Sequence, residues 1–293
     1  MIRDNSLAGK IFDGFNILLM ITIMIITAYP LLYVISASMS DPVQLAHHQG
    51  ILLLPQGFTL RAYQLVLENP NISTGYKNTL IYVVGGTSIN LFMTTLGAYV
   101  LSKKNMMWNN AIMFLIVFTM FFGGGMIPRF LLIRKLGMVN TRWALLIPNA
   151  IGTWNLIITR TSFMGIPNSL QESATIDGAS DFTVLLRIIL PLSLPVIAVM
   201  TLFYGVGHWN AWFDAMVFMR SRDLYPLQLF LREILIQNRA DSMMINFDYV
   251  EGERYKELVK YSTIVVATVP VLFIYPFLQK YFVKGVMVGA LKG

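Results

Sequence analysis

Long apolar stretches constrain this chain of 293 residues more than any other feature. A helix needs about 20 apolar residues to cross ~30 Å of hydrocarbon. The apolar residues show no strict alternation, so a β-barrel is not expected. The sequence therefore predicts an all-α membrane protein with six transmembrane helices in one domain, residues 1–293. We expect the spans at residues 15–35, 79–101, 111–133, 143–163, 192–213 and 262–278.

The composition agrees with a membrane protein. Hydrophobic residues make up 56% of the chain and charged residues 13%, about half the charged fraction of an ordinary soluble domain. The formal net charge of +7 fits contact with anionic lipid headgroups. Nucleic acid is not expected as a partner, because no Lys/Arg-rich block is present. The chain has no cysteine, which excludes disulfides and thiol catalysis.

The N-terminal segment resembles a signal peptide, because Arg3 and Lys10 precede an apolar run and the small residues 36–38 follow it. The run is about 20 residues long, which exceeds the usual hydrophobic region of a signal peptide. We therefore expect an uncleaved first span. Six spans place both termini on one side of the membrane. The distribution of Lys and Arg among the loops does not decide which side that is.

A polar segment at residues 164–191 separates the fourth and fifth apolar stretches. Ser169 and Glu172 form an S-x-x-E capping box, which predicts a short helix. Gly178 tolerates the left-handed conformation that ends a helix, so a sharp turn is expected there. A Ser-Asp pair can cap a second short helix at 182–189, and the Leu-Pro pair after it is expected to end that helix. The sequence therefore predicts two short helices at an angle on the membrane surface.

This segment resembles the cytoplasmic "EAA" loop in the permease subunits of bacterial ABC importers. That family has the pattern E-A-A-x(2)-D-G-A-x(8)-I-x-L-P, which residues 172–191 follow except that Ser173 replaces the first Ala. The resemblance implies that the loop transmits force from a separate ATPase subunit. The residues it assigns to ATPase coupling are Glu172, Ser173, Ala174, Asp177, Gly178 and Ala179. For each residue taken singly the alternative is a purely structural role, with Glu172 as a helix cap and Asp177 as a turn residue.

Two further regions extend the resemblance to the maltose/oligosaccharide class of importers. Residues 203–213 are similar to the Trp-Asn-containing fifth span of carbohydrate permeases, and residues 280–293 resemble the tail of the maltose-type second permease. Several details are similar to the second permease of an importer of alginate, an oligo-uronate. The expected function is a non-catalytic permease subunit for oligosaccharides, in the bacterial cytoplasmic membrane with both termini cytoplasmic.

The resemblance also implies a set of partners. They are a second homologous permease, two ATPase subunits and a periplasmic or extracellular solute-binding protein. ATP and Mg²⁺ would bind to the ATPases, since this chain has no Walker A motif. The loop 214–261 would be periplasmic and contact the binding protein; the alternative is a solvated connector. The cytoplasmic tail 280–293 would insert between the ATPases through Lys284, Gly285, Gly289 and Lys292; the alternative is a frayed terminus.

Polar groups inside a membrane are functional candidates by default. The possible substrate path comprises Asn90, Tyr204, His208, Trp209 and Asn210, whose aromatic members also suit helix packing or the interfacial belt. No metal site is expected, because the adjacent pair His47-His48 lacks a spaced third ligand. The Lys and Arg residues are too scattered to indicate an acidic substrate.

Two other classes of protein are alternatives for such a sequence. An ion-coupled secondary sugar transporter usually has acidic residues within its spans and broken helices near the membrane centre. The first four expected spans contain no Asp or Glu. A membrane enzyme would need a catalytic constellation, and neither a Ser–His–Asp set nor a carboxylate pair is evident.

Overall fold

The computed structural model describes residues 7–104, 106–236 and 249–290. Throughout these residues the regular elements are helices, and the part of the chain described contains no strand, so the all-α prediction is confirmed. Contacts divide the chain into two compact units. One comprises Met1–Asn69 with Glu233–Thr268, and the other comprises Pro70–Arg232 with Val269–Gly293.

The first unit is organised around the end of helix α1 (Leu7–Ser38). The loop after α1 folds back on it: Ser36 Oγ donates to the Leu53 carbonyl at 2.9 Å, and Ser40 Oγ accepts from the Gln56 amide at 3.0 Å. The early part of α15 (Tyr249–Ala290) also belongs here, with the Tyr261 ring edge-on to Tyr33 at 5.9 Å. Small side chains at 36–38 are buried and let the chain pack closely. The unit also includes α2 (Pro42–His47) and α3 (Arg61–Glu68).

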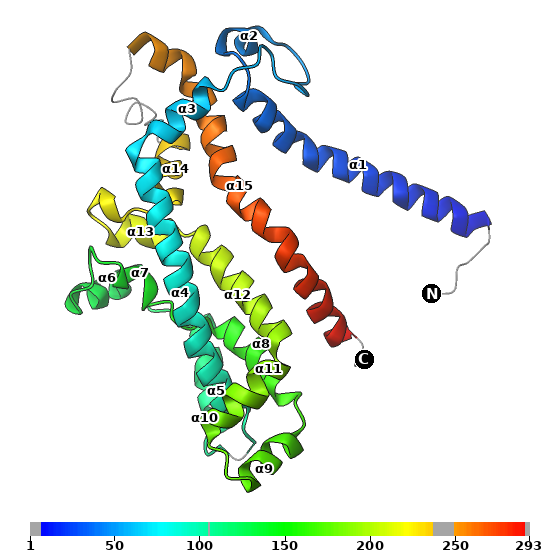
Figure 1. Cartoon of the computed structure of the whole chain (residues 1–293), viewed down its shortest axis with the longest axis vertical. Helices are drawn as coiled ribbons and strands as arrows, with labels where there is room; N and C mark the ends of the chain where they lie inside the picture. Colours follow the sequence, from blue (N-terminus) through cyan, green and yellow to red (C-terminus); the bar gives the residue numbers. More distant parts are fainter. Residues whose placement is uncertain (1–6, 105, 237–248, 291–293) are drawn as a thin grey trace. The chain divides into compact units, whose positions relative to one another are not determined.

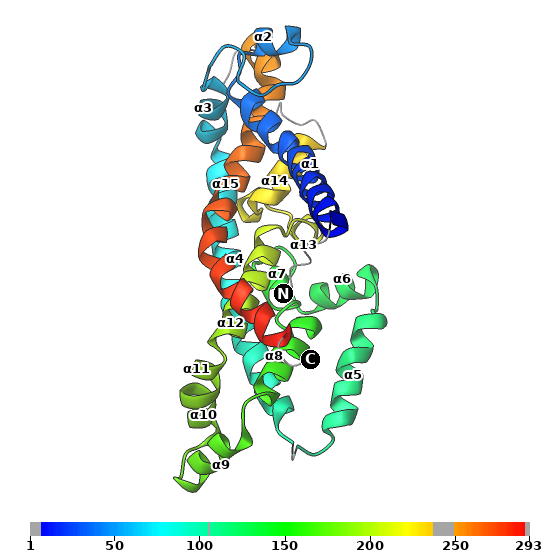
Figure 2. The same cartoon turned by 90° about the vertical axis from the view of Figure 1, so that its right-hand side faces the viewer.

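The second unit is built on three helices that lie side by side in both ribbon views (Figure 1, Figure 2). They are α4 (Pro70–Ser102), α8 (Thr153–Met164) and α12 (Leu194–Trp209). The buried face of α4 carries small and polar residues at helical spacing, which allow close helix approach. These include Gly75, Asn78, Thr79, Gly86, Asn90, Thr94 and Ala98.

The expected third span is two helices rather than one. Residues 111–133 fall in α5 (Asn109–Phe121) and α6 (Met126–Lys135), which are bent by 113°. Gly123, Gly124 and Gly125 occupy the break, and Gly125 has a φ of +80°. Glycine has a lower helix propensity than almost every other residue, so a run of three glycines costs little free energy to unwind. The prediction of a continuous helix here was therefore wrong.

The expected fourth span is also interrupted. Residues 143–163 comprise α7 (Trp143–Leu146), an irregular stretch, and α8. Pro148 and Gly152 lie in that stretch; proline cannot donate to a helix and disfavours helical backbone before it. The 12 residues of α8 extend about 18 Å, less than the hydrocarbon thickness.

The fifth span differs at both ends from the predicted 192–213. Helix α12 begins after Ser193 and ends at Trp209, and α13 (Phe213–Phe218) is a separate helix. Before it, a helical stretch over Asp181–Leu192 meets α12 at 85°. Among the residues described, α1 and α4 are long and apolar enough to span a membrane; the total rises to four if each bent pair counts as one span. The expected number of six is not confirmed.

The segment at 168–192 has the predicted two-helix form with different boundaries. Helix α9 (Asn168–Ile176) follows Pro167, which is the N-cap residue and provides no side-chain cap, so the capping box of Ser169 is absent. The proline fixes the entry of the chain and the helix starts before Ser169. In α10 (Asp181–Val184) the predicted cap is present: Ser180 Oγ accepts from the Thr183 amide at 3.3 Å.

The predicted stop at Leu190-Pro191 was wrong. After α10 the helix continues as the π-helix η1 (Leu185–Ile189) and then α11 (Leu190–Leu192). The wider turn of η1 leaves Pro191 in the first turn of α11, where its missing N–H is tolerated. The break falls instead at Ser193.

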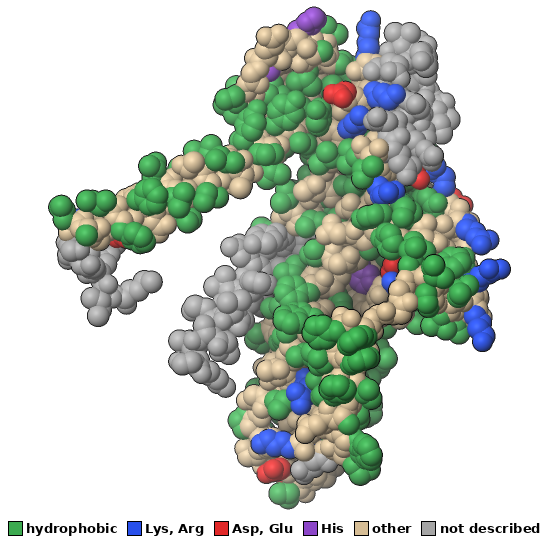
Figure 3. All heavy atoms as spheres, turned by 180° about the vertical axis from the view of Figure 1, so that it is seen from behind, with side chains coloured by type: hydrophobic (Ala, Val, Ile, Leu, Met, Phe, Trp, Pro, Cys, Tyr) green, Lys and Arg blue, Asp and Glu red, His purple; other side chains and the backbone are tan. Residues whose placement is uncertain are grey.

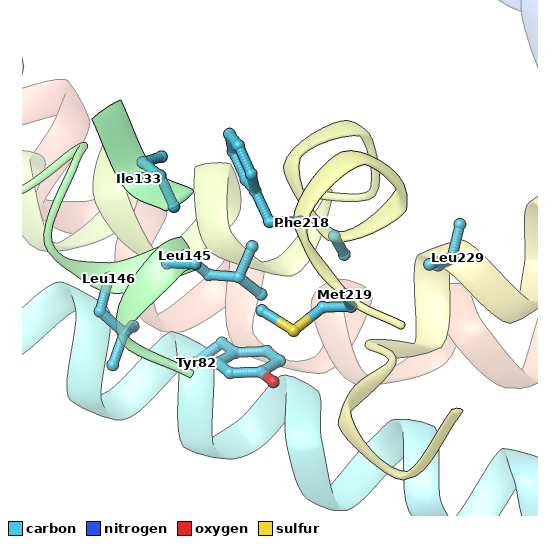
Figure 4. Close-up of a cluster of buried hydrophobic side chains, with 9 residues drawn as sticks. Tyr82, Ile133, Leu145, Leu146, Phe218, Met219 and Leu229 are labelled. Atoms are coloured by element: carbon cyan, nitrogen blue, oxygen red, sulfur yellow. The ribbon is translucent and has the colours of Figure 1, made fainter. Parts of the chain in front are cut away.

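Two apolar clusters hold the second unit together. The α13 cluster, drawn in Figure 4, has Leu145 and Met219 pointing toward the ring of Tyr82 on α4. It comprises Tyr82, Ile133, Ala144, Leu145, Leu146, Ala215, Phe218, Met219 and Leu229. The α10 cluster lies near the Ser102 end of α4. It comprises Ala98, Tyr99, Leu101, Leu156, Phe163, Val184, Leu185 and Ile189.

Candidate functional site

A cavity of about 290 Å³ lies between α4, α12 and the stretch before α8. We call it the polar cavity. Aromatic rings and amides line it together, a combination that suits a ligand with both apolar faces and hydroxyl groups. Its lining includes Tyr82, Asn90, Asn149, Phe203, Tyr204, His208 and Asp214.

Asn90 joins two other parts of the polar cavity's lining through hydrogen bonds. It is 1% exposed, and its Nδ2 donates to the Asn149 carbonyl at 2.5 Å. Its Oδ1 lies 2.6 Å from His208 Nε2, which therefore acts as the donor. Gly86, one turn before Asn90, makes room for the imidazole, because a Cβ there would lie 2.4 Å from Nε2. A buried amide with both ends bonded is rigid and costly to disrupt.

Tyr204 is anchored on the same face of α12. Its hydroxyl lies 2.6 Å from Thr94 Oγ1 and accepts a hydrogen bond from the Gly152 amide at 3.1 Å. The residue is 8% exposed, so the ring forms part of the wall rather than a mobile arm. Tyr204 and His208 are four residues apart, which places them on one side of the helix.

A charged pair stands at the edge of the polar cavity. Arg129 on α6 donates from Nη2 to Asp214 Oδ2 at 2.9 Å and to Asn149 Oδ1 at 3.2 Å. Asn149 Nδ2 donates to the same oxygen of Asp214 at 2.8 Å. The guanidinium also lies over the Phe218 ring at 5.6 Å. The side chains of Arg129 and Asp214 are 37% and 19% exposed, so this pair is shielded more than an ordinary surface ion pair.

The structure brings together three of the five candidates for the substrate path. Asn90, Tyr204 and His208 line the polar cavity. Trp209 turns to the neighbouring side of α12, lines a separate apolar cavity of about 390 Å³, and packs against Tyr76 at 6.3 Å. Asn210 is exposed and outside the lining. Successive helical residues point about 100° apart, which separates His208 from Trp209.

The sequence did not predict that Asn149 and Asp214 line this cavity, or that Arg129 pairs with Asp214 at its edge. Arg129 falls within the expected span 111–133, and Asp214 lies one residue beyond the expected span 192–213. No local pattern marks Asn149, which reaches the cavity because the chain leaves helical structure between α7 and α8. The sequence signal for Arg129 and Asp214 was their charge in or next to an expected span, where charged residues are functional candidates.

The second candidate region is the α9–α10 segment, residues 168–184. Gly178 has a φ of +81°, which confirms the predicted left-handed turn. The turn is closed by the Ala179 amide donating to the Ala174 carbonyl at 2.9 Å and by Gly178 donating to Thr175 at 3.0 Å. This is the pattern of a Schellman C-cap.

The six residues of the motif divide into two sets by exposure. Ala174 and Ala179 are half-buried and pack against the α10 cluster. Glu172, Ser173, Asp177 and Gly178 are exposed. Beside them Ile176 is 86% exposed and Phe182 is 65% exposed. The small side chains therefore mount the segment on the helices, and the others form an outward surface that is partly apolar.

One ion pair links this segment to the end of α4. Lys103 Nζ donates to Asp181 Oδ1 at 2.5 Å and lies 4.8 Å from the centre of the Tyr99 ring. Burial lowers the pKa of Lys103, but the hydrogen bond to Asp181 and the neighbouring Tyr99 outweigh it, so this pKa is raised. The lysine therefore remains charged at neutral pH. The side chains are 35% and 73% exposed, so the pair contributes little to stability.

The tail 280–293 is helical in the part that the structure describes. Lys284, Gly285 and Gly289 belong to α15, which runs unbroken through 280–290, whereas Lys292 lies outside the described residues.

The loop 214–261 holds α13, η2 (Arg222–Leu224) and α14 (Leu227–Leu235), and its residues 237–248 are outside the description. Helix α14 packs its apolar side inward, with Leu227, Phe230 and Leu231 buried.

Long apolar helices, a polar cavity between them and an outward two-helix segment at one end define a membrane transport protein. Residues 105–288 match the family "Binding-protein-dependent transport system inner membrane component". The chain belongs to this family, and its function is that of a permease subunit of an ABC importer. Subunits of this kind are generally non-catalytic.

Relatives and a solved structure support the assignment. The protein LplC of Bacillus subtilis (strain 168) is 41% identical over 290 residues, covering 99% of this chain and 97% of LplC. The polygalacturonan/rhamnogalacturonan transport system permease YtcP of the same organism is 38% identical, covering 97% and 99%. The crystal structure of a bacterial ABC transporter involved in the import of the acidic polysaccharide alginate has a chain that is 33% identical, with a TM-score of 0.88 over 95% of this chain and 99% of that chain.

Proposed function

We propose that this chain is the permease through which an ABC importer admits oligosaccharides that contain uronic acids. The observation that carries the proposal is its similarity, over nearly its whole length, to permeases named for polygalacturonan and for alginate. Both polymers bear a carboxylate on each sugar. The polar cavity supports the proposal, because it combines Tyr82, Phe203 and Tyr204 rings with amide and imidazole groups. Aromatic faces and hydrogen-bonding groups together suit sugar rings.

The α9–α10 segment is the proposed site of coupling to ATP hydrolysis. Two partner ATPase subunits would bind ATP and Mg²⁺, and one would grip the exposed surface around Glu172, Asp177 and Ile176. A solvent-exposed isoleucine outside an apolar span favours a protein partner, since exposed apolar surface is covered by docking. Movement of the segment would reach the cavity directly, because α10 to α11 connect through Ser193 to α12, which carries Tyr204 and His208.

The remaining parts of the assembly follow from the family. The family description names a binding protein, and the 214–261 loop is the proposed contact for it. A second homologous permease would complete the substrate path by alternating access. We place the protein in the bacterial cytoplasmic membrane with both termini in the cytoplasm. The residues Lys284, Gly285, Gly289 and Lys292 are the proposed contacts to the ATPases.

Single cysteines test the orientation, because the natural chain has none. Ile176→Cys and Ile236→Cys both occupy well exposed positions, 86% and 70%. In intact cells a membrane-impermeant maleimide is expected to label position 236 only, and position 176 after permeabilisation. Ile176→Cys should also cross-link to a co-expressed ATPase subunit. Labelling of position 176 from outside would contradict the coupling role.

Uptake into proteoliposomes tests the transport class. Liposomes that hold the permease pair and ATPases are expected to take up labelled oligogalacturonate only with internal ATP and external binding protein. Uptake that requires an ion gradient and no ATP would favour the secondary-transporter alternative instead.

A further inference from the structure

Arg129 uses only part of its hydrogen-bonding capacity. Both of its hydrogen bonds come from Nη2, one to Asp214 and one to Asn149. Among the residues that the structure describes, none accepts from its Nη1 or Nε. Arginine presents five N–H groups in a planar fork that matches a carboxylate with two parallel bonds. With its side chain 37% exposed, Arg129 can therefore receive a second acidic group.

Asp214 borders two cavities. It lines the polar cavity, and it also lines a cavity of about 650 Å³ formed by Gly123–Gly125, α6 and α13, to which Arg129 contributes as well. Figure 3 shows Lys and Arg side chains gathered over the α6, α7 and α13 part of the molecule. Asp214 therefore lies where the two cavities meet in the lining, and Arg129 is paired with it there.

The surroundings allow Arg129 to change partner at low cost. Asn149 Nδ2 donates to Asp214 at 2.8 Å, so the aspartate keeps a donor when the guanidinium turns away. The Phe218 ring supports the guanidinium at 5.6 Å without using an N–H group. Asp214 also prevents Arg129 from holding an anion permanently, because the two acidic groups compete for one cation. A transport site needs such reversible binding.

We propose that Arg129 binds the carboxylate of a uronic acid unit in transit and thereby determines the preference for acidic over neutral oligosaccharides. This assignment rests on the proposed function. The contact is a charge-assisted, bidentate hydrogen bond, which is the arrangement best suited to a planar carboxylate. Asp214 is the internal group that the substrate carboxylate replaces.

The test compares uptake of trigalacturonate and of its neutral methyl ester in the reconstituted importer. The variant Arg129→Gln/Asp214→Asn removes both charges and leaves no unpaired aspartate. It is expected to raise the KM for the acid about tenfold or more, since a hydrogen bond to a charged group is lost, and to leave the KM for the ester within about twofold. Arg134→Gln is the matched control, because it removes the same charge from an exposed position on α6.

The outcomes separate this inference from the proposed function. Equal loss of acid and ester uptake, or an unchanged KM for the acid, would overturn the role of Arg129 while leaving a transporter of oligosaccharides. Failure of the unmodified importer to transport either sugar would overturn the proposed function itself. Asp214→Asn alone should lower the KM for the acid, because the guanidinium then has no competing carboxylate; a higher KM would contradict the exchange.

Discussion

The two candidate functional regions of the second unit are held together by different physical interactions. The α9–α10 segment stands on small residues, Ala174 and Ala179, and displays an exposed surface. The polar cavity is held by hydrogen bonds between buried or half-buried groups, centred on Asn90. The first region depends on backbone shape and, in the proposed function, on a partner that covers it. The second depends on partners already present inside the chain.

This difference predicts how each region fails. A change at the α9–α10 turn should remove coupling and leave the fold intact, because few internal contacts depend on it. A change around Asn90 in the polar cavity should affect both transport and stability, because Asn90 and His208 satisfy each other's hydrogen bonds. The following substitutions test that contrast, from the largest expected effect to the smallest.

Gly178→Val should abolish transport. Gly178 has a φ of +81° with no atom within 4 Å of a built Cβ, so the obstacle is backbone strain rather than space. A β-branched residue is strongly disfavoured there, whereas asparagine tolerates this conformation. We expect uptake to fall at least about 100-fold for valine if the turn is needed for docking, with membrane insertion unchanged. Gly178→Asn at the same position is the control and should retain most uptake.

The measurement is ATP-dependent uptake alongside quantified protein in the membrane. Normal uptake by a well-expressed Gly178→Val protein would show that the shape of this turn is not required.

Gly86→Ala should impair transport and stability moderately. A Cβ at position 86 would lie 2.4 Å from His208 Nε2, whereas at Gly85 it would meet no atom within 4 Å. The imidazole must move and lose its bond to Asn90, at a cost of about 1–3 kcal/mol in unfolding free energy. Gly85→Ala is the adjacent control and should stabilise α4 slightly.

Thermal unfolding in detergent and uptake kinetics would measure both effects. If the two alanine variants behave alike, His208 is not held as the structure shows.

Removing the Lys103–Asp181 pair should have the smallest effect. The side chains are 35% and 73% exposed, and exposed pairs typically contribute about 0.2–1 kcal/mol. Because the pKa of Lys103 is raised, its contribution persists through neutral pH and is lost only as the pH rises past that pKa. A double-mutant cycle with Lys103→Ala and Asp181→Ala in thermal unfolding would measure the coupling. A coupling well above this range, unaffected by salt, would contradict a surface pair.

The sequence predicted the turn between α9 and α10 because the information for it is local. The motif is contiguous, and the left-handed glycine follows from steric rules that apply wherever the chain turns. The exposure of Ile176 and the anchoring of Ala174 could not be predicted in the same way, because both depend on where α4 and α8 end.

The polar cavity was only partly predictable for the opposite reason. Asn90, Asn149 and Asp214 line it from three separate segments, and Arg129 bonds to Asp214 from a fourth. Their convergence depends on breaks in the expected helices. Hydropathy averages over about 20 residues and does not register such breaks. Gly123–Gly125 and Pro148 were visible in the sequence, yet a membrane context often keeps such residues within a helix.

The contrast between α1 and α4 has a consequence for how the protein enters the bilayer. The most apolar window of α1 has 0% of its residues buried in the chain, whereas that of α4 has 33% buried. Residues such as Asn78, Asn90 and Thr94 of α4 would face lipid if that helix were inserted alone, at a cost of several kcal/mol for unpaired polar groups. Helix α1 can therefore integrate as soon as it leaves the translocon. We expect stable insertion of α4 to require later segments that shield these polar groups, so biogenesis of this subunit should be late and cooperative.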